Sequence, residues 1–272
     1  MAAISLCLHQ ATNKGKIMTF RFRQVVAVSM LAMGGLAQAA YVDVPAGTPS
    51  PYDGFTYQGA LALTYGADIL GAWDTFRVSV SSYGAGMVTA SRDTDGFFAQ
   101  MSQTAPMSSV TVDSGTGALA RYDSAGGTTI TVPALKSVTS GGSFTLTDLS
   151  VDFKQKQVNA TIIGANGVGT LTNFHLLDIQ SITLVGAGQG CPAFGDCAYP
   201  RFTASGLILT AEGYNKISQS LGLQQLGRAA IWDPIDFGVL TTVAIPEPST
   251  YTLMGVGLLG VWGAAKRRRA RL

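Results

Sequence analysis

Few residues in this 272-residue chain have the types and spacing that catalysis requires. A serine hydrolase would have to use His175, which lies between Phe174 and Leu176, and this apolar context favours a buried strand. The Gly-x-Ser-x-Gly turn that presents a nucleophilic serine does not occur in the sequence. We therefore interpret His175 as a strand-edge or core histidine and predict no catalytic residue.

The carboxylates do not group into a catalytic or metal-binding set either. Asp93-Thr94-Asp95-Gly96 begins like a calcium loop, but Phe97 to Gln100 lack the completing acid, which favours a turn over an irregular calcium site. Glu212 is the sole glutamate between residues 41 and 245, and no pair of acids stands out for glycoside hydrolysis. The sequence predicts a protein that is not an enzyme and has no metal site and no cofactor.

The N-terminal segment, residues 1–40, has the features of an N-terminal extension followed by a secretory signal peptide. Arg21 and Arg23 precede an apolar run from Val25 to Leu36, and Ala37-Gln38-Ala39 supplies small residues for cleavage. The alternative is a membrane anchor, but the apolar run is shorter than the roughly 20 residues that span a bilayer. We expect the segment to direct export.

The C-terminal segment, residues 246–272, joins three features in a fixed order. Pro246-Glu247-Pro248-Ser249 comes first, and its two prolines keep the backbone extended and accessible. Tyr251 to Ala265 is an apolar, glycine-interrupted run that is shorter than a bilayer core demands. The basic end, which should stay on the cytoplasmic side of the membrane, consists of Lys266, Arg267, Arg268, Arg269 and Arg271.

This order of motif, apolar run and basic end resembles the PEP-CTERM sorting signal of Gram-negative bacteria. The resemblance implies export across the inner membrane, transient retention there by a hydrophobic sorting helix, and final placement at the cell surface or outside the cell. It also implies a partner, an exosortase-type membrane enzyme that recognises the motif and removes the tail. A plain single-pass anchor is the alternative.

Two cysteines lie between the export segments, Cys191 and Cys197. In an exported protein, an isolated pair favours a disulfide. A metal site would need two further ligands, and His175 is the single histidine between residues 41 and 245. We therefore predict that these two cysteines are bonded.

The chain between the export segments is acidic. Residues 41–245 hold nine of the 18 Lys and Arg and 15 of the 16 acids, which gives a net charge of −6. A basic patch for phosphate backbones is absent from this sequence, so no nucleic-acid partner is predicted. Fourteen of these acids are Asp, which is typical of turns and favours a β-protein.

Short alternating segments separated by Gly-, Ser- and Asp-rich turns predict many strands. We expect them at residues 55–63, 76–81, 86–91, 97–102, 108–112, 118–122, 129–135, 175–185, 202–210 and 237–243, with a meander over 143–164. Helical spacing appears at 211–221 and briefly at 69–73. The predicted fold of residues 41–245 is all-β, a two-layer antiparallel β-sandwich with one or two short helices. Two stacked subdomains divided near Gly141-Gly142 are the alternative.

Two segments of the chain look alike. Leu61 to Gly66 and Leu207 to Gly213 each contain Leu-x-Leu-Thr at a strand end, and a short helical pattern follows. Pseudo-symmetric edges of one sandwich would explain the likeness, and so would chance in a chain rich in Leu and Thr.

A second resemblance is weaker. The layout of Ser143 to Ile163 followed by Leu207 to Gly213 is similar to the haem-transport-associated domain, an all-β module of exported bacterial proteins. That family's haem ligand is a tyrosine, for which Tyr65 and Tyr83 are candidates by position alone. The resemblance therefore implies the fold rather than haem binding.

These features together predict an exported surface or extracellular-matrix protein of exopolysaccharide or biofilm settings, with a structural role and an exopolysaccharide as candidate partner. The alternative is an exported β-module that binds haem or a glycan. Aromatic side chains would then stack on sugar rings, with Tyr52, Tyr57, Trp73, Tyr83 and Trp232 as candidates, whereas the alternative places most of them in the core or in strand pairs.

The first testable prediction concerns the cysteine pair. Thiol labelling of the exported protein under denaturing, non-reducing conditions should find Cys191 and Cys197 unreactive, because an oxidising compartment favours their disulfide. Reduction before labelling is the control and should expose both thiols. Two labelled thiols without reduction would refute the disulfide.

Overall fold

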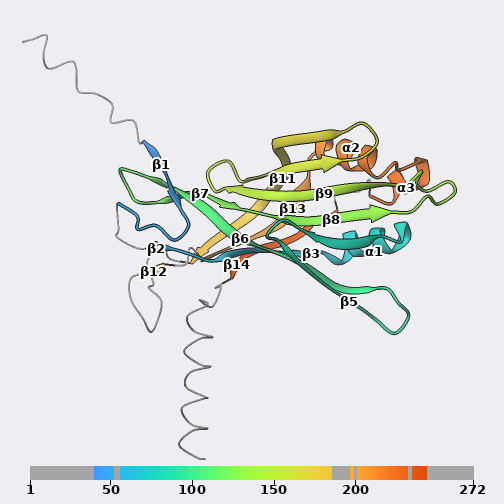
Figure 1. Cartoon of the computed structure of the whole chain (residues 1–272), viewed down its shortest axis with the longest axis horizontal. Coiled ribbons are helices and arrows are strands. Elements are labelled where there is room, and N and C mark those ends of the chain that lie inside the picture. Colours follow the sequence, from blue (N-terminus) through green and yellow to red (C-terminus); the bar gives the residue numbers. More distant parts are fainter. Residues whose placement is uncertain (1–39, 52–55, 186–196, 199–200, 232–234, 244–272) are drawn as a thin grey trace, which may run out of the picture. The chain divides into compact units, whose positions relative to one another are not determined.

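The structure is a computed structural model that describes residues 40–51, 56–185, 197–198, 201–231 and 235–243 (Figure 1). The chain divides into two units, residues 1–38 and 39–272, and all described residues belong to the second. The predicted signal peptide and sorting segment lie outside the described residues.

The described elements are mostly strands. The first half of the chain holds β1 (Tyr41–Pro45), β2 (Thr56–Tyr57), β3 (Ala60–Tyr65), α1 (Ala67–Phe76), β4 (Ser79–Tyr83), β5 (Met87–Arg92), β6 (Phe98–Asp113), β7 (Leu119–Ser124) and β8 (Gly127–Val132). The second half holds β9 (Gly142–Asp152), β10 (Gln157–Gly164), β11 (Gly169–Val185), β12 (Cys197–Ala198), β13 (Arg201–Leu209), α2 (Ala211–Ser220), α3 (Gln225–Ala229) and β14 (Gly238–Val243).

Eight antiparallel strands close into a barrel. Their order is β6-β3-β14-β13-β11-β10-β9-β7, and β7 pairs back to β6. Outside this ring, β1 and β5 each add to β6, β8 adds to β9, and β4 adds to β8. The short strands β2 and β12 form a separate parallel pair.

The all-β prediction is confirmed, but the two-layer sandwich is not, because the main sheet closes on itself. The alternating pattern fixes which face of a strand is buried and says nothing about which strand becomes its neighbour. The predicted strands at 97–102 and 108–112 are one strand, β6, of 16 residues. This length lets β6 pair with β3 and β1 along one edge and with β5 and β7 along the other.

The barrel interior is filled by apolar side chains from all eight strands. Buried examples, one from each strand in barrel order, are Met101, Leu63, Leu240, Ala204, Leu177, Val158, Val151 and Tyr122. Several of them are direct cross-strand partners, as Leu240 is of both Leu63 and Ala204. Such pairs stabilise a sheet by their mutual contact, so the ring of interior side chains is continuous around the barrel.

The strand that closes the ring, β7, is held from inside and outside. Inside, the Tyr122 ring packs edge-on against Phe202, with 5.5 Å between ring centroids. Outside, the Arg121 guanidinium lies 3.2 Å from the Asp43 carboxylate on β1 and 3.1 Å from Asp123. The exposed ion pairs are each worth little, so the aromatic contact supports β7 more than they do.

The Tyr122 hydroxyl is fully buried and finds no hydrogen-bond partner among the described residues. Burial also raises the pKa of this phenol, because the low-dielectric interior disfavours the phenolate. The side chain therefore contributes through its ring rather than through its hydroxyl.

The second prediction follows from this difference between ring and hydroxyl. Tyr122→Phe should leave the free energy of unfolding unchanged or raise it by about 1 kcal/mol, since an unpaired buried hydroxyl is removed. Tyr122→Ala should lower it by about 3–5 kcal/mol, because the interior loses a large ring. Urea denaturation followed by circular dichroism measures both. A large loss of stability in Tyr122→Phe would show that the hydroxyl has a partner.

Candidate functional site

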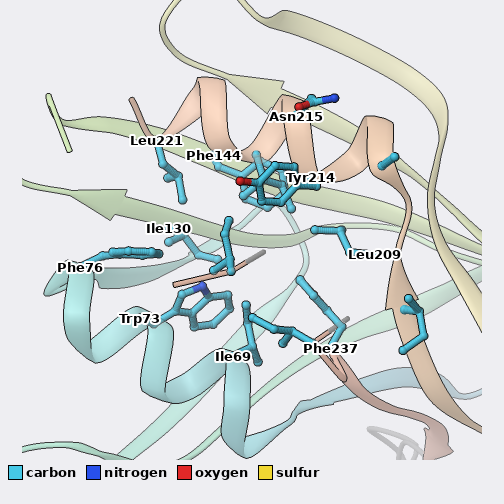
Figure 2. A pocket seen from close by; sticks show the side chains of 15 residues that line it. Ile69, Trp73, Phe76, Ile130, Phe144, Leu209, Tyr214, Asn215, Leu221 and Phe237 are labelled. Atoms are coloured by element: carbon cyan, nitrogen blue, oxygen red, sulfur yellow. The ribbon is translucent and has the colours of Figure 1, made fainter. Parts of the chain in front are cut away.

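The described residues form a cavity of about 360 Å³ at the end of the barrel where α1 and α2 lie (Figure 2). This volume falls within the range of about 300–1,000 Å³ that is usual for small-molecule pockets. Figure 2 shows Trp73 on α1 and Tyr214 on α2 on opposite sides of the space. Strands β8 and β9 contribute Ile130 and Phe144, and Phe237 precedes β14.

Helix α1 brings one apolar face to the cavity. Ile69, Trp73 and Phe76 are four and three residues apart, so they lie along one side of the helix, and all three are buried. The helix ends at Arg77, whose left-handed backbone (φ 53°) lets its N–H bond the carbonyl oxygen of Asp74. Because α1 follows β3 directly, the barrel fixes where this face points.

Helix α2 forms the opposite side. Its first turn is capped by Thr210, whose Oγ1 accepts the Gly213 N–H at 2.9 Å and donates to the His175 carbonyl oxygen at 3.1 Å. Tyr214 and Ile217 are three residues apart and both line the cavity. A Cβ at Gly213 would come within 2.9 Å of the Leu176 carbonyl oxygen, so glycine permits the close approach of α2 to β11.

An aromatic cluster supports the α1 side of the cavity. Trp73 and Phe237 both contact Tyr65, with ring centroids 4.6 and 5.7 Å away. The Tyr65 hydroxyl donates to Gln103 Oε1 at 3.1 Å inside the barrel, and burial raises the pKa of this phenol. The cluster connects the barrel core to the cavity.

Apolar contact is the chemistry that the cavity offers. Among the described residues that line it there is no Asp, Glu, Lys, Arg, His or Cys. Its polar groups are the Trp73 indole, the Asn215 amide and the Tyr214 hydroxyl, which donates to the Arg228 carbonyl oxygen at 3.1 Å. Among the described lining residues, these groups do not form a set for proton transfer or metal binding.

The histidine and the Asp93 loop lie elsewhere. His175 is part of β11, and its side chain, 38% exposed, pairs with the exposed Asp178 at 2.9 Å, so the expected buried setting is wrong. It borders a shallow polar hollow together with Glu212. Asp93 Oδ1 accepts the N–H groups of Asp95 and Phe97 at 3.0 and 2.9 Å, which confirms the predicted turn.

The two tyrosines considered as haem ligands are far from equivalent. Tyr65 is buried and donates its hydroxyl proton to Gln103, whereas Tyr83 is an exposed residue of β4. Neither lines the cavity. The weak resemblance to the haem-transport-associated domain gains no support from these positions.

Sequence reasoning did not find the cavity, although one signal pointed to it. The two similar segments, Leu61 to Gly66 and Leu207 to Gly213, are the places where β3 leads into α1 and β13 leads into α2. Strands β3 and β13 flank β14, and the helices that follow them line one cavity. A repeated strand-to-helix transition can therefore mark a site that no catalytic motif reveals.

The other predicted site residues fall outside the described side chains. These are the motif Pro246, Glu247, Pro248 and Ser249, the basic end from Lys266 to Arg271, and Cys191; of Cys197 only the backbone of β12 is described. Within the part of the chain that the structure covers, no helix is long and apolar enough to cross a membrane.

Comparison with known proteins identifies one segment. The family description of the PEP-CTERM protein-sorting motif matches residues 244–269. The chain thus carries this sorting motif, which supports an exported protein of Gram-negative bacteria that an exosortase-type membrane enzyme processes. No curated protein and no solved structure matches the chain.

The third prediction tests the cap that positions α2. Thr210→Ala should lower the free energy of unfolding by about 1 kcal/mol, because the Gly213 N–H loses its acceptor. Thr210→Ser keeps the hydroxyl and should lose much less. Urea denaturation of both variants measures the difference. Equal losses of stability in the two variants would show that the Thr210 methyl group, rather than the capping hydrogen bond, stabilises the protein.

Proposed function

We propose that an exosortase-type enzyme cleaves this protein near Pro246-Glu247-Pro248-Ser249 and that the barrel is thereby delivered to the cell surface or the extracellular matrix. The observation that carries the proposal is the sorting motif at residues 244–269. The apolar run and the basic end hold the uncleaved chain in the inner membrane, with the motif near its outer face. The extended Pro-Glu-Pro backbone is then accessible to an integral enzyme.

The fold is compatible with removal of the tail. All eight barrel strands lie between Ala60 and Val243, and the matched segment begins at residue 244. Cleavage after that point removes no strand and breaks no described ladder pairing. A barrel with its ring of pairings intact needs no tail to complete it.

At the surface, the barrel serves a structural, non-enzymatic role in an exopolysaccharide or biofilm matrix, with an exopolysaccharide as its candidate partner. Its acidic body, with a net charge of −6 over residues 41–245, favours solubility outside the cell. The second candidate role is the binding of a small molecule, which the cavity between α1 and α2 favours.

The fourth prediction tests processing. Intact-mass analysis of the protein from a host that carries the sorting enzyme should show loss of the residues after the motif. Glu247→Ala should prevent this loss and leave the full-length chain in the inner membrane. Glu212→Ala is the matched control, because Glu212 is the one other glutamate of the chain and is exposed on α2.

A mass that includes Leu272 in the unmodified protein from that host would overturn the proposal. Normal processing of Glu247→Ala would show that the enzyme does not need this carboxylate. Retention of Glu212→Ala in the membrane would mean that the assay reports a general export defect instead of recognition of the motif.

A further inference from the structure

We propose that the cavity between α1 and α2 is a binding site for an uncharged, largely hydrocarbon small molecule, such as a medium-chain alcohol or a terpenoid alcohol. This goes beyond sorting and matrix placement, since it assigns a ligand class to the barrel itself. The proposal rests on the lining, the volume and the position of the cavity.

The lining excludes a charged ligand group. The described residues around the cavity carry no ionisable acid or base apart from the Tyr214 phenol, whose hydroxyl donates to the Arg228 carbonyl oxygen. Figure 2 shows the Asn215 amide pointing away from the aromatic side chains that surround the cavity. Among the described residues that line the cavity, a buried carboxylate or ammonium would find no counter-charge, and transfer of an unpaired charge from water is strongly unfavourable.

The inner wall favours hydrocarbon. Trp73, Phe76 and Phe144 are at most 3% exposed, so a ligand that reaches them is removed from water. Burial of apolar surface drives such binding without directional contacts. Flat aromatic rings and branched isoleucines offer extended contact area to a chain or a fused ring.

The volume sets the size of the ligand. An apolar cavity of about 150 Å³ accommodates benzene. The cavity here, about 360 Å³, is more than twice as large. A molecule of roughly ten to fifteen carbon atoms is the matching size by this scale.

The cavity has an exposed rim that provides entry. Ala211 and Asn215 lie on the exposed side of α2 and also line the space, whereas Ile217 on the same helix and Leu221 directly after it are buried. The rim therefore lies at the first turns of α2, and a large side chain at position 211 would obstruct it without replacing a core residue.

The cavity is also remote from the processing segment. Phe237, which lines it, directly precedes β14, and Val243 ends this strand directly before the matched motif. At about 3.4 Å per residue, the strand separates the two by roughly 17–20 Å. Binding and processing can therefore fail separately, and a defect in one does not imply a defect in the other.

The experiment titrates the protein, purified from its exporting host in the form that host produces, with the neutral fluorophore N-phenyl-1-naphthylamine. Emission should rise and saturate, and decanol should displace the probe. Decanoate at the same concentration and neutral pH should displace it at least tenfold less well. Ala211→Trp should weaken probe binding at least tenfold.

Ala67→Trp is the matched control, since Ala67 is the exposed first residue of α1 and does not line the cavity. It should bind the probe as the unmodified protein does. Thermal melts by circular dichroism verify that both variants are folded. The decanol and decanoate titrations use the unmodified protein and remain decisive if Ala211→Trp does not fold.

Three results would overturn the proposal. Emission that does not saturate would show that no site exists. Equal displacement by decanoate and decanol would contradict the uncharged ligand class. Unchanged affinity in folded Ala211→Trp would place the probe outside the cavity.

Discussion

The barrel depends on the pairing of β7 with two strands at once. Residues Arg121 to Asp123 pair with β9, and β7 also pairs with β6, so the edges of these two long strands face a partner instead of solvent. Without β7 the sheet would be open, and unpaired backbone groups near a buried interior are costly. The closure is short, three residue pairs on the β9 side, and it is supported by the contact of Tyr122 with Phe202.

Closure of the ring also limits where a ligand site can form in the described chain. The barrel interior is occupied by side chains, so a ligand site has to form at an end of the barrel. Helix α1 follows β3 and helix α2 follows β13 at the same end of the barrel. Phe237, directly before β14, lines the cavity there as well. The cavity lies between the apolar faces of the two helices.

The sequence predicts much of the local structure and less of its assembly. The alternation of Val158, Ala160 and Ile162 correctly marks β10, and the spacing of Tyr214 and Ile217 marks α2. These patterns arise from contacts within one element, which the sequence displays directly. The choice between sandwich and barrel depends on whether a three-residue ladder forms between β7 and β9. These two strands are separated in sequence by β8, so no local pattern indicates that they pair. The cavity was missed for the same reason, because its walls come from five separate parts of the chain.

The cavity lies near one end of β14, and the matched sorting motif begins one residue after the other end. The motif is identified from its sequence alone, in which two prolines favour an extended backbone. The cavity, in contrast, exists only where two helices and three strands have assembled. Since β14 is paired on both edges, with β3 and with β13, it holds its two ends at a fixed separation. Loss of the residues beyond Val243 changes neither ladder, because the last described pair on the β3 side is Val243 with Ala60. The barrel can therefore lose its sorting segment and keep the geometry of its cavity.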